Sequence, residues 1–87
     1  MGVSFDPDKD KANVAKHGIS LARAVDFAIE AVVADDRYEY GESRFRAYGQ
    51  IDGIDHCLVY VLREGHIRAI SLRRAHDREM RRHVPRS

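Results

Sequence analysis

Arginine is concentrated near the end of this 87-residue chain, in the segment from His66 to His83. Six arginines occur there: Arg68, Arg73, Arg74, Arg78, Arg81 and Arg82. A guanidinium can bind a phosphate or a carboxylate through two parallel N–H bonds, which an ammonium group does not offer. We therefore expect this segment to bind a polyanion or an acidic partner.

The nearly neutral composition hides this concentration of charge. The formal net charge is +1, yet residues 1–62 carry seven Lys and Arg against eleven Asp and Glu. Residues 63–87 carry eight Arg against three acids. A simpler interpretation stays open, in which the arginines form a solvated helix face that makes weak ion pairs with Asp77 and Glu79.

If the polyanion is RNA, the chain also carries residues that could cleave it. RNA is cleaved without a metal when its own 2′-hydroxyl attacks the adjacent phosphate. The protein then supplies a base, an acid and positive charge. Candidates for proton transfer are Lys9, Lys16, His17 and Glu42, and the arginines would supply the charge. Composition alone does not separate such a nuclease from a binding module.

No pattern in the sequence predicts a metal or an organic cofactor. No His pair has the i, i+4 spacing with an acid, and the chain lacks a phosphate-binding P-loop and a GxGxxG motif. The only cysteine, Cys57, lies in an apolar run and is expected to be a buried, small hydrophobic residue. Because the sequence shows no disulfide, signal-peptide or membrane-span pattern, we expect a cytoplasmic location.

Two helices are expected in the first third of the chain. Asp6 and Pro7 are typical of a helix start and Gly18 of a helix end, which predicts a helix over residues 7–17. A second helix is predicted after Ser20, because apolar residues then recur at helical spacing. This stripe consists of Leu21, Ala24, Val25, Ala28, Ile29 and Val32. Val32 and Val33 could also begin a short strand.

The remaining segments resemble strands joined by tight turns. Residues 44–51 alternate in polarity, and residues 56–63 and 67–73 are rich in residues that favour strands. Turns are predicted at Tyr40-Gly41-Glu42, Asp52-Gly53 and Glu64-Gly65. A short helix over residues 78–83, capped by Asp77, closes the chain.

These elements predict an α+β domain in which N-terminal helices pack on one face of an antiparallel sheet of three to four strands, followed by a short C-terminal helix. We expect one domain over residues 1–84 and a frayed tail over residues 85–87. The other face of the sheet would be open, with Arg44, Arg46 and Tyr48 available to RNA phosphates and bases. In the strand over residues 67–73 neither side is cleanly polar, which leaves its core face undecided.

Three blocks of the sequence resemble the BrnT family of type II toxins, which are relatives of the RelE-like ribonucleases. FDPDKDKANVAKHG is similar to the family's Trp-Asp-Pro-x-Lys followed by Asn-x-x-Lys-His-Gly, with Phe5 at the usual Trp. DRYEYGESRFRAYGQIDG is similar to Asp-x-Arg-x-x-Tyr-Gly-Glu-x-Arg, although Arg37 directly follows the acid here. HIRAISLRRAHDRE is similar to Ile-Arg-x-Ile-Ser-x-Arg-Arg-Ala-x-x-x-Glu over residues 67–79. The three blocks cover nearly the whole chain.

The resemblance implies a RelE-like fold and metal-independent RNA cleavage that inhibits translation. It also implies a cognate antitoxin with a ribbon-helix-helix DNA-binding domain, a heterotetramer with that antitoxin, and repression of the operon's own promoter. The catalytic residues would be Lys9, His17, Arg68 and Arg73, with the two proton-transfer roles resting mainly on the resemblance. The substrate-binding residues would be Arg44, Arg74, Arg78, Arg81 and Arg82, the last three of which bind RNA or the antitoxin.

One departure from the family pattern affects the proton-transfer assignment. The family often has an aromatic residue after the last Glu, where this chain has Met80 to His83. In RelE-like enzymes such a C-terminal Tyr can take part in catalysis, so His83 is a candidate substitute. The alternative function, from another class, is a noncatalytic nucleic-acid or protein-binding module that acts as a corepressor with a DNA-binding partner.

Overall fold

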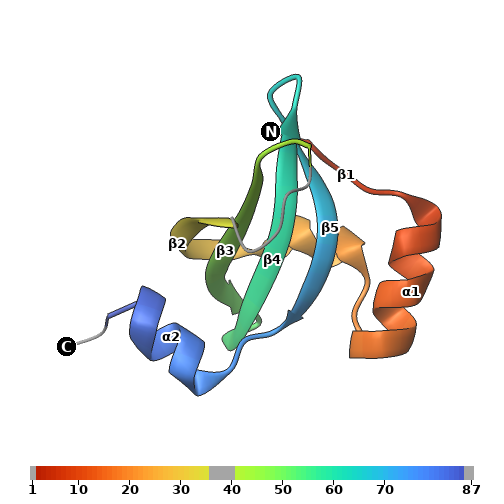
Figure 1. Cartoon of the computed structure of the whole chain (residues 1–87). Helices are drawn as coiled ribbons and strands as arrows, with labels where there is room; N and C mark the ends of the chain where they lie inside the picture. Colours follow the sequence, from red (N-terminus) through yellow and green to blue (C-terminus); the bar gives the residue numbers. More distant parts are fainter. Residues whose placement is uncertain (1, 36–40, 86–87) are drawn as a thin grey trace.

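The computed structural model describes residues 2–35 and 41–85, which form a five-stranded mixed sheet with helices around it (Figure 1). The strand order is β1-β5-β4-β3-β2, in which β1 runs parallel to β5 and the other neighbours are antiparallel. The strands are β1 (Val3–Ser4), β2 (Ala28–Asp35), β3 (Arg44–Ile51), β4 (Ile54–Arg63) and β5 (His66–Arg74). The predicted α+β class is confirmed, and the arrangement is consistent with a RelE-like fold. The sheet has more strands than the three to four expected, and β1 adds a parallel pair.

The first helix, α1 (Pro7–His17), forms as predicted. Asp6 Oδ1 accepts a hydrogen bond from the Asp8 N–H at 2.8 Å, and Gly18 ends the helix with φ at 73°. Asp10 Oδ1 accepts from Ser20 Oγ and from the Leu21 N–H, which ties α1 to the segment that follows it.

The predicted second helix over residues 21–32 is wrong. Its first part is a short 3₁₀ helix, η1 (Leu21–Asp26), capped by Ser20 as expected, and the rest belongs to strand β2. The apolar stripe splits accordingly: Leu21 is buried, whereas Val25 is 70% exposed and Val32 is 47% exposed. The β-branched residues of β2 favour an extended strand, and pairing with β3 satisfies its backbone.

Pairing of β2 with β3 depends on a glycine. A Cβ atom at Gly49 would collide with the backbone carbonyl of Ala28 and with the ring of Phe27. Only glycine therefore allows the start of β2 to approach β3 this closely. This contact joins residues far apart in the sequence, so local helical spacing does not reveal it.

Both faces of the sheet carry a hydrophobic cluster, which differs from the open face that we expected. One cluster lies against η1 and the N-terminal segment and contains Leu21, Ala24, Ala47, Ile51, Leu58, Tyr60, Ala69 and Leu72. The other contains Tyr48, Cys57, Met80 and Val84, so the closing helix α2 (Asp77–His83) packs on the second face. Helices therefore lie on both sides of the sheet rather than on one.

Burial beneath α2 changes the role expected for Tyr48. Its side chain is fully buried, and its ring stacks on that of His83 with the centroids 4.8 Å apart. The prediction that Tyr48 stacks on an RNA base is therefore wrong. Cys57 is buried, as predicted. Helix α2 begins at Asp77 with His76 as the capping position, one residue before the cap that we predicted.

The predicted hairpin turns at Asp52-Gly53 and Glu64-Gly65 are confirmed, and all four residues have positive φ. The predicted turn at Tyr40-Gly41-Glu42 begins outside the described residues. Arg37 of the second BrnT-like block also lies outside them. Of the predicted tail over residues 85–87, only Pro85 lies within the described residues. No helix in the described part of the chain is long and apolar enough to cross a membrane.

Candidate functional site

A β-bulge decides which side chains of β5 share a face. The register between β4 and β5 shifts between Val59 and Tyr60, which leaves Ile70 as an extra residue of β5. Without the bulge, Arg68 and Arg73 would point to opposite faces of the sheet. With it, both lie on the face on which α2 packs. This settles the strand face that alternation of residue types left undecided.

The side chain of Asn13 attaches α1 to the edge of β5. Its Nδ2 donates to the carbonyl oxygens of Leu72 and Ile19, both at 2.8 Å, and its Oδ1 accepts from the Leu72 N–H at 3.0 Å. The amide thus makes the two bonds that a neighbouring strand would make to Leu72. Asn13 is 5% exposed. Figure 1 shows the result, with α1 lying beside β5 on the side away from β4.

A cleft lies between α1 and β5, on the bulged part of the strand. It is lined by Lys9, Ala12, Asn13, Lys16 and His17 of α1 and by Ile70, Ser71 and Arg73 of β5. Three of the four predicted catalytic residues, Lys9, His17 and Arg73, are therefore brought together. The described lining residues include no carboxylate, so the cleft is suited to an anion.

The pKa values of His17 and Arg73 are shifted in opposite directions. The pKa of His17 is lowered by burial of its ring, and further by the charges of Lys16 and Arg73. A neutral imidazole can accept a proton. The pKa of Arg73 is raised by its hydrogen bonds to Glu79, so its guanidinium stays charged. The cleft therefore combines an imidazole whose neutral form is favoured with a guanidinium that stays charged.

The guanidinium of Arg73 is hydrogen-bonded to Glu79 of helix α2. Glu79 accepts two hydrogen bonds from the Arg73 guanidinium, at 2.9 and 2.7 Å, and one from the His76 N–H at 2.9 Å. These bonds lower the pKa of Glu79 to about 2, with the Arg73 bonds as the largest cause. The weak ion-pair interpretation expected the arginines of the C-terminal helix to pair with Glu79. The arginine that pairs with Glu79 is instead Arg73 of β5.

The Glu79 pKa predicts how stability depends on pH. Because the folded pKa is lower than the ordinary 4.5, the stabilisation is fully present above pH 4.5 and is lost as pH falls toward 2. We expect the Glu79→Gln variant to be less stable than wild type by about 1–2 kcal/mol at pH 5.5, with the partial exposure of both side chains reducing the effect. This difference should shrink as pH falls to 2.5. Urea unfolding of both proteins at the two pH values measures it, and a difference that stays constant would contradict the assignment.

Two predicted arginines share the sheet face with Arg73 but do not line the cleft. Arg68 pairs with Val61 and lies five positions before Arg73, which separates them by about 13–16 Å along the strand. Arg44 lies on β3, two strands away from β5. The structure therefore places Arg68 and Arg44 outside the group of cleft residues that contains His17.

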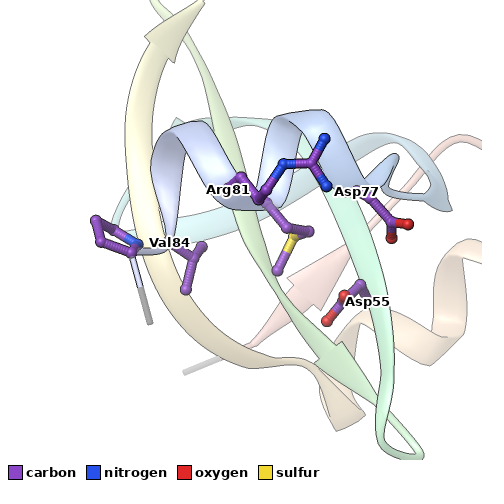
Figure 2. Close-up of a pocket in the computed structure, with 6 residues that line it drawn as sticks. Asp55, Asp77, Arg81 and Val84 are labelled. Carbon is purple, nitrogen blue, oxygen red and sulfur yellow. The ribbon is translucent and has the colours of Figure 1, made fainter. Parts of the chain in front are cut away.

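The other predicted substrate-binding arginines are on the surface at the end of β5 and on α2. Arg74, Arg78, Arg81 and Arg82 are all exposed. Arg81 lines a separate hollow between α2 and the beginning of β4, shown in Figure 2, together with Asp55, Asp77, Met80, Val84 and Pro85. Two carboxylates in this hollow would repel a phosphate, so the cleft beside Arg73 is better suited to RNA.

Two further candidates for proton transfer lie away from the cleft lining. Glu42 forms an ion pair with Arg63 at 2.8 Å, which lowers the pKa of Glu42. His83, the last residue of α2, stacks on the ring of Tyr48. Within residues 2–35 and 41–85, no three His, Cys, Asp or Glu side chains are grouped so that they could hold a metal ion.

A protein-family model matches most of the chain. Residues 5–79 match the family model described as ribonuclease toxin, BrnT, of type II toxin-antitoxin system. The chain belongs to the BrnT family. A BrnT toxin of a type II system acts as a ribonuclease and has a cognate antitoxin. The search of curated proteins gave no match.

The residues that match the BrnT model include the cleft lining but not the end of α2. The matched residues include both walls of the cleft and end at Glu79, the partner of Arg73. Arg81 and Arg82 follow the match. The matched range therefore contains every residue that lines the cleft, whereas of the three arginines of α2 it contains only Arg78.

Sequence reasoning did not identify Asn13, Ser71 or Glu79 as residues of this site. A signal was available, because all three occupy specified positions in the blocks that resemble the BrnT family. Their roles depend on contacts between distant elements. Asn13 binds the backbone of β5, Ser71 lines the cleft formed when α1 lies beside β5, and Glu79 of α2 bonds to Arg73 of β5.

Proposed function

We propose that this BrnT-family protein cleaves RNA without a metal, and that the cleft between α1 and β5 is its active site. The observation that supports this most directly is the meeting of His17 and Arg73 in one cleft that carries no described carboxylate. Attack by a 2′-hydroxyl needs a base, and the crowded phosphorus centre needs positive charge. The lowered pKa of His17 and the fixed charge of Arg73 meet these two needs.

In the proposed reaction, His17 removes the proton from the 2′-hydroxyl as its oxygen attacks the adjacent phosphorus. The bond from phosphorus to the 5′-oxygen of the next nucleotide breaks, and Lys9 donates a proton to that leaving oxygen. The products are a 2′,3′-cyclic phosphate and a 5′-hydroxyl. Arg73, assisted by Lys16, stabilises the negative charge that develops on the phosphate oxygens.

Arginines outside the cleft are proposed to hold the rest of the RNA. Arg68 and Arg44 share the sheet face with Arg73, and Arg74 is exposed at the end of β5. Each can bind a flanking phosphate. The exposed residues Arg78, Arg81 and Arg82 on α2 bind RNA or the antitoxin.

The partner is proposed to be an antitoxin with a ribbon-helix-helix domain, bound in a heterotetramer that represses its own operon. Free toxin would cleave RNA and inhibit translation. The same arginines that bind RNA phosphates suit an acidic or helical antitoxin segment, so the antitoxin would mask them.

Induced expression in bacteria tests this proposal, with and without the neighbouring reading frame. We expect growth to stop when the chain is produced alone and to recover when the neighbour is produced with it. Unaffected growth in the presence of accumulated soluble protein would contradict the toxin function and favour the noncatalytic corepressor.

The role of His17 predicts the pH dependence of cleavage. A general base must be unprotonated, so kcat/KM should fall on the acid side as His17 is protonated. Because the pKa of His17 is lowered, this fall should occur below pH 6.5. The His17→Ala variant should be about 10²-fold less active and should lose this acid limb. A pH profile of both proteins decides the point, and an acid limb that persists in the variant would assign the base to another group.

A further inference from the structure

The hydrogen bonds of Arg73 leave one particular edge of its guanidinium available. A guanidinium has five N–H groups in a fixed plane. Nη1 donates to Glu79 Oε2 at 2.9 Å and to the Arg74 carbonyl at 3.1 Å, and Nη2 donates to Glu79 Oε1 at 2.7 Å. Glu79 therefore occupies the edge formed by Nη1 and Nη2.

The two remaining donors are Nε–H and the second hydrogen of Nη2, which lie parallel on the side edge of the guanidinium. No hydrogen bond among the described residues uses this edge. The Arg73 side chain is 24% exposed and lines the cleft, whereas Glu79 is not among the residues that line it. Two parallel N–H groups match two oxygens of one phosphate.

We propose that Glu79 is a positioning residue that holds Arg73 by its end edge, so that the side edge binds one RNA phosphate in the cleft through two hydrogen bonds. This inference rests on the proposed function of the cleft. The proposed effect of Glu79 is to orient the guanidinium of Arg73. The negative charge of Glu79 by itself would weaken the attraction of Arg73 for a phosphate.

Glu79 is itself held in place, which allows it to fix another side chain. Its carboxylate accepts from the His76 N–H, and its helix is anchored by Met80 and Val84 in the cluster with Tyr48 and Cys57. A long, flexible arginine is thereby ordered before RNA arrives, and a bidentate contact is sensitive to such order.

Cleavage of a short RNA by single and double variants tests this proposal. Glu79→Gln keeps the size of the side chain but replaces one accepting oxygen with an amide, so it should lower kcat/KM by about 10-fold. In the Arg73→Lys background, which has no guanidinium edge to orient, the same change should alter kcat/KM by less than about 2-fold. Equal losses in both backgrounds would show that Glu79 only stabilises the fold and would overturn the proposal.

Asp52→Asn is the matched control. Asp52 accepts a 2.8 Å hydrogen bond from Arg23 at the turn between β3 and β4, and Asn tolerates the φ of 53° found there. This variant removes a carboxylate that pairs with an arginine outside the cleft lining, and its cleavage rate should equal that of wild type. Wild-type protein that fails to cleave RNA would overturn the proposed function itself, and that result is distinct from wild-type cleavage that does not depend on Glu79.

A binding measurement gives a second readout that does not require an active variant. An RNA oligonucleotide with 2′-deoxy sugars cannot be cleaved by the proposed reaction. Its addition should shift the Arg73 Nε–H signal in a ¹H–¹⁵N spectrum, because that proton lies on the edge assigned to the phosphate. A signal that shifts little, while signals of Lys16 or His17 move, would contradict the assignment of this edge.

Discussion

Replacing Arg73 with alanine should remove growth inhibition and lower RNA cleavage by about 10²–10³-fold, as the loss of one preorganised charge at a transition state typically does. Arg73 is the only arginine among the described residues that line the cleft, where it faces His17, Lys9 and Lys16. Its charge is fixed, and Glu79 orders it before substrate binds. Initial rates on a short RNA, together with growth after induction, measure the effect.

The control for this prediction is Arg23→Ala, which removes an arginine that pairs with Asp26 and Asp52 and does not line the cleft. It should retain cleavage within about 2-fold of wild type, since exposed ion pairs contribute little to stability. Both variants should keep the circular-dichroism spectrum of wild type. Full activity in a folded Arg73→Ala protein would exclude Arg73 from catalysis.

Replacing Asn13 with alanine should destabilise the protein by about 2–4 kcal/mol. The change removes three hydrogen bonds and leaves the N–H and carbonyl of Leu72 without their partners at a buried edge of β5. It also releases α1 from β5, so cleavage should fall with stability as the two walls of the cleft separate. Urea unfolding at neutral pH measures the loss of stability.

Two further substitutions on α1 sharpen this prediction. Asn13→Asp keeps an acceptor for the Leu72 N–H but cannot donate to the carbonyls of Leu72 and Ile19, so it should also be strongly destabilising. Val14→Ala, at a neighbouring side chain that is 45% exposed, should cost less than about 0.5 kcal/mol. Similar small losses at positions 13 and 14 would show that the amide does not carry the attachment of α1.

Elements with local signals could be predicted from the sequence. The caps Asp6 and Gly18 bound α1, and the turns at Asp52-Gly53 and Glu64-Gly65 set the ends of the hairpins. Each of these signals acts through a residue's own side chain or its own φ, so neighbouring letters of the sequence suffice.

Elements that depend on distant partners could not be predicted in this way. The stripe from Leu21 to Val32 fits a helix, but the bonds of β2 come from β3, and Gly49 provides the space for that pairing. The bulge at Ile70 likewise depends on the register with β4, and it places Arg68 and Arg73 on the same face of the sheet. The local periodicity of the sequence predicts neither the β2–β3 pairing nor the bulge.

The types of residue in the candidate site could be predicted from the sequence, but their grouping in space could not. An excess of arginine and the resemblance to BrnT toxins pointed to His17, Lys9 and Arg73, which the fold brings together. Residue type also made Arg68 and Arg44 candidates for the site, yet they lie outside the cleft lining. Residue type gives the charge of a side chain, whereas the strand register and the docking of α1 decide which charges meet.

If the cleft promotes attack by the RNA's own 2′-hydroxyl, the ends of the cleavage products and the response to EDTA should show it. We expect wild-type protein in EDTA to cleave RNA and to leave a 2′,3′-cyclic phosphate and a 5′-hydroxyl, and we expect a 2′-deoxy substitution at the cleavage site to block the reaction. Loss of activity in EDTA, or products that carry a 5′-phosphate, would contradict it.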